Sequence, residues 1–182
     1  VDFADTLNGF AVGENAGTSA GIILRTTDGG ESWTPVSIGT VNGLSAVRTV
    51  DANTAYAAGM VGTILKTTNS GTSWTAQTSG TTNWLQSLVF PSSSVGFAAG
   101  SGGTILKTTN GGAAWTKLTT GSLNWLYAVS SPDTSSLTAV GAGGTVLTSG
   151  TGGATGTSRT SGVANGLHAG GSAVGNDTAV FA

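Results

Sequence analysis

The sequence has no cysteine, one histidine and one methionine. The absence of cysteine excludes a disulfide framework but leaves the redox compartment open, because a chain of 182 residues can bury a core without disulfides. The single histidine, His168, has no carboxylate pattern beside it, and such a residue is typically a surface or packed side chain. We therefore predict no metal site, no cofactor and no catalytic residue.

Charge is also scarce. Lys, Arg, Asp and Glu make up 8% of the residues, against about a quarter in ordinary soluble domains. A net charge of −2 without a Lys/Arg cluster argues against a nucleic-acid partner. No apolar run approaches the length of a transmembrane helix. The weakly charged, hydroxyl-rich composition favours an extracytoplasmic location, whether periplasmic, lumenal or secreted.

What the sequence does contain is a repeat. Trp33, Trp74 and Trp115 are 41 residues apart, and each lies in a near-copy of one hairpin sequence. The hairpin copies are Ile22 to Thr34, Thr63 to Thr75 and Thr104 to Thr116. The same step separates four asparagines, which extend the repeat to a fourth copy and the beginning of a fifth: Asn42, Asn83, Asn124 and Asn165. In the fourth copy Gly156 replaces the tryptophan and the turn has become Ser149 to Gly153. A repeat of this length predicts one structural unit per copy.

Each copy is expected to form four short β-strands. No segment shows a sustained helical period, and short apolar runs alternate instead with Gly, Asn, Asp and Ser. In the second copy the expected strands are Leu44 to Val50, Thr54 to Gly59, Thr63 to Thr68, and Ser73 to Thr78. Four strands in about 40 residues is the size of one propeller blade. The prediction is an all-β fold, a β-propeller of four-stranded blades.

The repeats divide one domain, residues 1–182, into copies at about 1–40, 41–81, 82–122 and 123–163, with a partial copy at 164–182. A propeller closes with whole blades, or with a blade completed by the opposite terminus. Because the first copy already supplies all four of its strands, we expect either a fragment of a larger propeller or an open array completed by another chain. An unclosed array exposes strand edges that favour pairing.

The repeated turns resemble a known motif. Thr26, Asp28, Gly30, Ser32 and Trp33 match a full Asp-box, the BNR-type repeat of sialidases and related propellers. The second copy has Thr67, Asn69, Gly71, Ser73 and Trp74, and the third has Thr108, Asn110, Gly112 and Trp115. Together with the flanking strands over roughly residues 1 to 148, the chain resembles the photosystem II stability/assembly factor family and its bacterial relatives. The resemblance implies that these box residues maintain the fold, away from the usual binding face.

Candidate binding residues lie where the copies differ. Trp84 and Trp125 occupy one repeat position, just before the first strand of their copies, and Tyr127 lies two residues further on. In a propeller these residues lie opposite the Asp-boxes, beside the central channel. They could form an aromatic contact surface for a protein or a sugar. The alternative is that the two indoles pack between adjacent blades.

A second candidate set is basic. Arg25, Lys66 and Lys107 share one repeat position and would form an arc on successive blades. In the assembly-factor family, positive surface is associated with docking of the client protein, so the resemblance implies a partner contact here. The alternative is that each stem covers its blade edge while the charged group stays in water.

The preferred function is a non-catalytic binding, assembly or scaffold propeller that docks a protein partner or belongs to a larger complex. One alternative is part of a sialidase-like glycoside hydrolase, with a carbohydrate ligand. That chemistry needs an arginine cluster and a Tyr/Glu pair, whereas the arginines here are only Arg25, Arg48 and Arg159, and Tyr56 and Tyr127 lie on different copies. A further alternative is a structural module of a surface layer or extracellular assembly.

Overall fold

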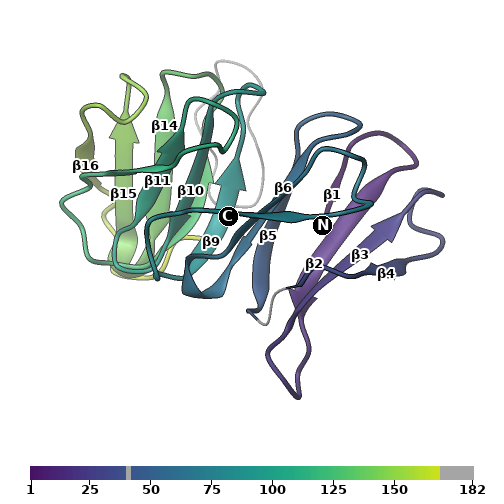
Figure 1. Ribbon diagram of the computed structural model, residues 1–182. Coiled ribbons are helices and arrows are strands. Elements are labelled where there is room, and N and C mark those ends of the chain that lie inside the picture. Colours follow the sequence, from purple (N-terminus) through teal and green to yellow (C-terminus); the bar gives the residue numbers. More distant parts are fainter. Residues whose placement is uncertain (40–41, 169–182) are drawn as a thin grey trace.

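The computed structural model describes residues 1–39 and 42–168. These residues form four separate four-stranded antiparallel sheets, called blades here, which stand side by side in chain order (Figure 1). Each blade is built from four consecutive strands, so no strand crosses to a neighbouring sheet. The prediction of four-stranded blades, one per copy, is confirmed. Residues 169–182, which hold most of the fifth copy, lie outside the described residues.

The strands agree closely with the expected ones. The first blade contains β1 (Asp2–Phe3), β2 (Gly9–Glu14), β3 (Gly21–Thr26) and β4 (Thr34–Val36). The second contains β5 (Leu44–Thr49), β6 (Ala55–Gly59), β7 (Ile64–Thr67) and β8 (Thr75–Gln77). The third contains β9 (Leu85–Val89), β10 (Gly96–Gly100), β11 (Ile105–Thr108) and β12 (Thr116–Leu118). The fourth contains β13 (Leu126–Ser130), β14 (Leu137–Gly141), β15 (Thr145–Ser149) and β16 (Thr157–Thr160).

Two short 3₁₀ turns, η1 (Met60–Gly62) and η2 (Ala142–Gly144), join second and third strands. They are the only helical segments in the described ranges, and neither has the length or apolarity to cross a membrane.

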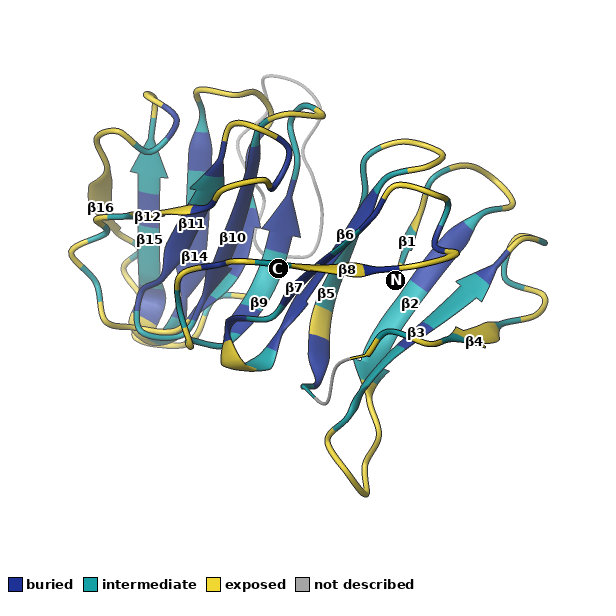
Figure 2. Cartoon of the chain, in the orientation of Figure 1, coloured by how far each residue is buried: buried dark blue, intermediate teal, exposed yellow. Residues whose placement is uncertain are grey.

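The first strand of each blade lies innermost. β5 contacts β9, and β9 contacts β13, so neighbouring blades meet along their first strands. The second strands of the middle blades, β6 and β10, are buried along their whole length because a blade covers each face. The fourth strands form an exposed outer rim of only three or four residues each (Figure 2). Such short edge strands offer little backbone for pairing with other chains.

The core is divided among the blade interfaces. Between the first two blades, Phe10 and Ile23 pack against Leu65 and Trp74. The rings of Phe10 and Trp74 meet edge to face, with centroids 5.4 Å apart. Two further clusters fill the next interfaces, one around Tyr56 and Leu106 and one around Phe97 and Leu147. Each blade therefore buries its apolar faces by stacking on its neighbours.

The turns between third and fourth strands, called box turns here, are closed by side-chain hydrogen bonds. The Thr26 hydroxyl donates to Asp28 Oδ1 (2.7 Å) and accepts from the Gly30 N–H (2.9 Å). The second and third copies repeat both bonds. In the second copy the glycine, Gly71, has φ = 79°, and a Cβ added to it would collide with the Phe10 ring of the preceding blade. This position therefore needs glycine for both its backbone conformation and its packing.

The fourth copy keeps this geometry with different residues. The Ser149 hydroxyl accepts from the Gly153 N–H at 2.9 Å, the bond that threonine makes in the other copies. The Thr155 N–H donates to Thr151 Oγ1, also at 2.9 Å, in place of the carboxylate or amide acceptor. The turn thus survives although Asp and Trp are both absent.

The blades have two different ends. The box end carries the box turns and the turns between first and second strands. The opposite end, called the aromatic end here, carries the segments that lead into the first strands and the turns between second and third strands. From the second blade onward it comprises residues 42–45, 60–63, 79–86, 101–104, 120–127, 142–145 and 161–168.

The periodic asparagines acquire a role at the aromatic end. The Asn83 side-chain amide donates to Thr104 Oγ1 at 2.7 Å, and Asn124 donates to Thr145 at 2.8 Å. Each bond ties the segment that leads into a first strand to the start of the third strand of the same blade. The asparagines therefore fix the path by which the chain enters each blade.

Candidate binding surface

A continuous strip of side chains crosses the aromatic end. The Trp84 and Trp125 rings, on the third and fourth blades, lie edge to face with centroids 5.6 Å apart. Trp125 is followed by Tyr127 at 6.5 Å, and Tyr127 stacks on His168 at 4.3 Å with nearly parallel rings. At the other end of the strip, the Trp84 indole N–H donates to Ser45 Oγ on the second blade, 2.6 Å away. We call these five residues the aromatic strip.

The sequence predicts that the two tryptophans either form an exposed contact surface or pack between adjacent blades, and the strip has features of both. Trp84 does contact its neighbours across two blade boundaries, since it bonds Ser45 and touches Trp125. Trp125 nevertheless remains 38% exposed, which is high for an indole. The binding role of Trp84, Trp125 and Tyr127 stays a prediction. The repeat position drew attention to the aromatic residues. Ser45 shares the repeat position of Tyr127 and His168, but the sequence does not predict the bond from Trp84 to Ser45, because that contact exists only after two blades pack together.

The basic arc is engaged within the molecule. Lys66 Nζ donates to the Gly111 carbonyl in the box turn of the next blade (2.8 Å), and Lys107 Nζ donates to the Gly152 carbonyl in the same way (2.7 Å). Both ammonium groups also lie near aromatic rings of their own blades. The two ammonium groups are therefore held by protein, unlike the expectation that they stay in water. Arg25, at the equivalent position on the first blade, is partly buried.

Most carboxylates of the described chain serve turns at the box end. Hydrogen bonds from the Ser32 hydroxyl and N–H, and then from the Thr26 hydroxyl, hold the pKa of Asp28 well below its usual range. The Ser135 and Ser136 hydroxyls and N–H groups lower the pKa of Asp133 in the same manner. Backbone N–H groups also lower the pKa values of Asp5 and Asp51. A general acid needs a pKa near the working pH. These four aspartates have lowered pKa values, which suits ionised side chains that hold turns.

The remaining paired carboxylate, Asp2, accepts from the Thr49 N–H and hydroxyl and lies 3.7 Å from Arg48. This contact joins the first strands of the first two blades. Within residues 1–39 and 42–168, no three His, Cys, Asp or Glu side chains gather as metal ligands would.

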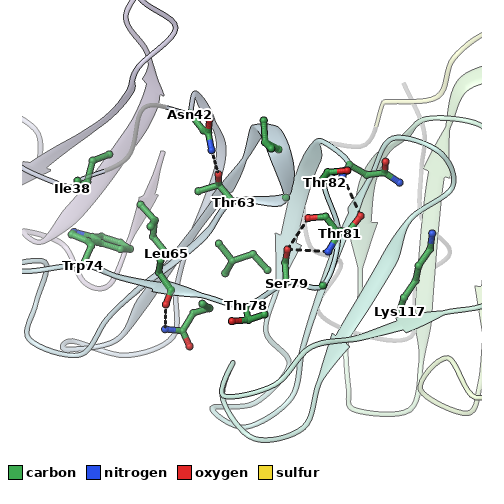
Figure 3. Close-up of a pocket in the computed structure, with 18 residues that line it drawn as sticks. Ile38, Asn42, Thr63, Leu65, Trp74, Thr78, Ser79, Thr81, Thr82 and Lys117 are labelled. Atoms are coloured by element: carbon green, nitrogen blue, oxygen red, sulfur yellow. Dashed lines mark hydrogen bonds between the residues drawn. The ribbon is translucent and has the colours of Figure 1, made fainter.

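A groove of about 1040 Å³ lies beside the second blade (Figure 3). Trp74 and Leu65 form one side of it, and the hydroxyl-bearing residues Thr78, Ser79, Thr81 and Thr82 form another. Its polar groups bond one another: the Ser79 hydroxyl donates to the Thr81 carbonyl at 3.2 Å. The groove therefore has the lining of a joint between blades.

Comparison with solved structures identifies the fold. A structure of YCF48 from Cyanidioschyzon merolae superposes with a TM-score of 0.65 at 17% identity, over 83% of this chain and 57% of that one. A structure of YCF48 bound to a D1 peptide gives a TM-score of 0.57 at 17% identity, over 63% of this chain and 38% of that one. An ancestral GH74 enzyme gives a TM-score of 0.62 at 19% identity, over 84% of this chain and 24% of that one.

The chain thus spans only 38% and 57% of the length of the two YCF48 structures. No family model and no curated protein sequence matches it. Both YCF48 and GH74 structures are β-propellers. The four stacked four-stranded sheets and these superpositions together identify the chain as a β-propeller.

Proposed function

We propose that this chain is a non-catalytic binding or scaffold propeller that docks a protein partner on its aromatic end, outside the cytoplasm. The observation that carries the proposal is the aromatic strip, which joins three blades and leaves Trp125 exposed at its centre. Partly exposed aromatic residues beside packed ones are typical of protein-binding hot spots. A structure of similar fold, YCF48, was determined with a bound D1 peptide.

The non-catalytic part rests on the carboxylates. Glycoside hydrolysis needs two carboxyl groups with separated roles, one of them a proton donor. Here Asp28 and Asp133 are stabilised as anions by their own turns, and Asp2 is paired with Arg48. The GH74 superposition supports a shared fold and adds no catalytic pair to this chain. The low charge content supports the extracytoplasmic assignment.

The aromatic strip is a stronger contact surface than the arc of Arg25, Lys66 and Lys107. Two of the three cations in the arc already satisfy carbonyl groups of the next blade. A partner that bound these lysines would have to replace both bonds. We therefore assign the arc mainly to blade packing and keep Arg25 as a secondary contact.

Site-specific photo-crosslinking tests this function. A photoreactive phenylalanine analogue at Leu123, which precedes the strip and is 87% exposed, should give a discrete crosslinked protein in extracts of the source cells. The same analogue at Glu31, exposed in the box turn of the first blade, is the control at the opposite end. The product at position 123 should vanish when Trp125→Ala is added. Identical products at both positions, or none at position 123, would refute docking on the aromatic end.

A further inference from the structure

The aromatic end is free of charged side chains from the second blade onward. Its segments, residues 42–45, 60–63, 79–86, 101–104, 120–127, 142–145 and 161–168, contain no Lys, Arg, Asp or Glu. The box end is different, because its turns hold Asp5, Asp28, Glu31, Asp51 and Asp133. The first blade contributes one charge to the aromatic end, Glu14 at the end of β2, whose carboxylate lies beside Gly43. From the second blade onward the two ends differ in binding chemistry, with charges at the box end and none in these segments of the aromatic end.

Apolar side chains are exposed on this uncharged end. Leu123 is 87% exposed, Val61 57% and Val163 50%. Val61 belongs to η1, which contacts β9 at the start of the third blade, while Leu123 lies two residues before Trp125. Together with the aromatic strip, these residues make a surface whose free energy of contact comes from burying apolar area.

Val61 is retained there at a conformational cost. Its φ angle is +54°, in the left-handed region that β-branched residues rarely adopt. The equivalent turn positions in the third and fourth blades are glycines, Gly102 and Gly143, with φ = 61°. The second blade thus places a strained, exposed valine where the fold itself accepts glycine. Strain of this kind at an exposed position points to a function for the side chain.

The rings of the strip are arranged for side chains and not for sugar rings. Trp84 and Trp125 meet at an interplanar angle of 68°, and Trp125 and Tyr127 at 40°. One face of Tyr127 is covered by His168. A glycan chain needs open, roughly coplanar ring faces, whereas these tilted rings are flanked by the exposed aliphatic residues Leu123 and Val163, which suit contact with apolar side chains.

We infer that the partner segment held by the aromatic end is an uncharged, apolar stretch of polypeptide. This inference rests on the proposed function and adds the chemistry of the ligand. Because Trp84, Trp125, Tyr127 and the exposed aliphatic residues beside them carry no charge to pair with a partner's ions, charged partners would lose hydration there without compensation. Binding should also be insensitive to ionic strength, since surface ion pairs are what salt screens.

Selection from a random library of short displayed peptides on the folded chain tests the inference. The library is first depleted on the Trp125→Arg variant and then selected on the unchanged chain, with Lys117→Glu as a surface control. We expect the enriched peptides to be uncharged and rich in aliphatic, aromatic or proline residues. Their affinity should be the same at low and high sodium chloride, and at least about tenfold weaker for Trp125→Arg.

Val61→Gly gives a second test, whose expected result differs from that of a variant that merely unfolds. Removing the strained side chain should raise the Tm and at the same time weaken binding of the selected peptides severalfold. Enrichment that depends on Trp125 but yields acidic or basic peptides would overturn the inference and leave the docking proposal standing. Enrichment that is independent of Trp125, or none above the starting library, would overturn both. Binding of a neutral oligosaccharide such as cellohexaose, lost in Trp125→Arg, would also overturn the inference.

Discussion

Lys66 on the second blade and Gly111 on the third are joined by a hydrogen bond of 2.8 Å from the ammonium group to the carbonyl oxygen. The Tyr56 hydroxyl donates to the same carbonyl at 2.7 Å. Lys107 and Gly152 repeat the lysine bond between the third and fourth blades. The apolar clusters supply most of the contact between blades, and these polar bonds fix how far one blade can slide or rotate against the next.

Lys66→Met keeps most of the apolar stem but removes the bond to Gly111. We expect the free energy of unfolding to fall by about 1 to 2 kcal/mol, near the lower end of the values for hydrogen bonds to charged groups, because the Gly111 carbonyl keeps its bond from Tyr56. Denaturant unfolding measures the loss. Lys117→Met, on the exposed outer strand, is the matched control and should change stability little. Equal effects in the two variants would show that the bond between blades contributes nothing.

The tryptophans at the two ends of the blades should respond differently to truncation. Trp74 is buried against Phe10, so Trp74→Ala should cost about 3 to 5 kcal/mol of stability. Trp84→Ala should cost less and weaken partner binding instead. Chemical denaturation of both variants, combined with the crosslinking assay at Leu123, separates the two roles. Equal large losses of stability with unchanged binding would show that Trp84 is a core residue and not a binding residue.

Trp74→Phe refines that experiment. The buried indole N–H of Trp74 has no hydrogen-bond partner in the described structure. Phenylalanine removes this group while keeping an aromatic ring against Phe10. The loss of stability should therefore be clearly smaller than that of Trp74→Ala. A loss as large as that of alanine would indicate that the shape of the indole, and not its apolar area, holds the interface together.

Acid should destabilise the fold through its turn carboxylates. The folded-state pKa of Asp28 is lowered by Ser32 and Thr26, so its contribution to stability is present above the unfolded pKa of about 3.9 and is lost as pH falls below it. Asp28→Asn should make the loss of stability in acid smaller, because an amide has no proton to gain there. The variant should still fold, since Asn69 fills the same position in the second blade with equivalent bonds. Unfolding measured from neutral pH down into the acid range tests this. Parallel curves for both proteins would contradict it.

The chain should not hydrolyse sialosides or aryl glycosides. The reason is that the Asp side chains of the described chain are committed to turns or to Arg48, and no arginine cluster is present in the sequence. Release of a chromogenic aglycone is the measurement. Turnover above buffer that disappears in Glu14→Gln or Glu31→Gln would show that an active site exists.

The fold could be predicted from the sequence because each copy repeats the same local rules. Glycines and short polar residues mark every turn, and the apolar runs between them are strand-length. The expected strands of the second copy end within two residues of β5 to β8. Trp74 and Trp115 could be assigned to the core from the repeat alone.

The contacts between blades could not be predicted in the same way. The sequence identifies Lys66 as a repeated cation, but it does not show that the ammonium group reaches the Gly111 carbonyl, 45 residues away. Ser45 looks like any exposed serine until the third blade brings Trp84 to it. Such contacts depend on the rotation between successive sheets, which local spacing does not encode.

The fourth box turn carries a consequence for how repeats of this kind diverge. Ser149 and Thr151 still hold the backbone of the turn, although the tryptophan has become Gly156 and the carboxylate is gone. The geometry of this turn therefore requires only hydroxyl groups and a glycine, which many sequences can supply. A count of blades based on the tryptophan motif would give three, one fewer than the four sheets among the described residues. In chains that have drifted further, propellers are expected to retain blades long after their signatures can no longer be read.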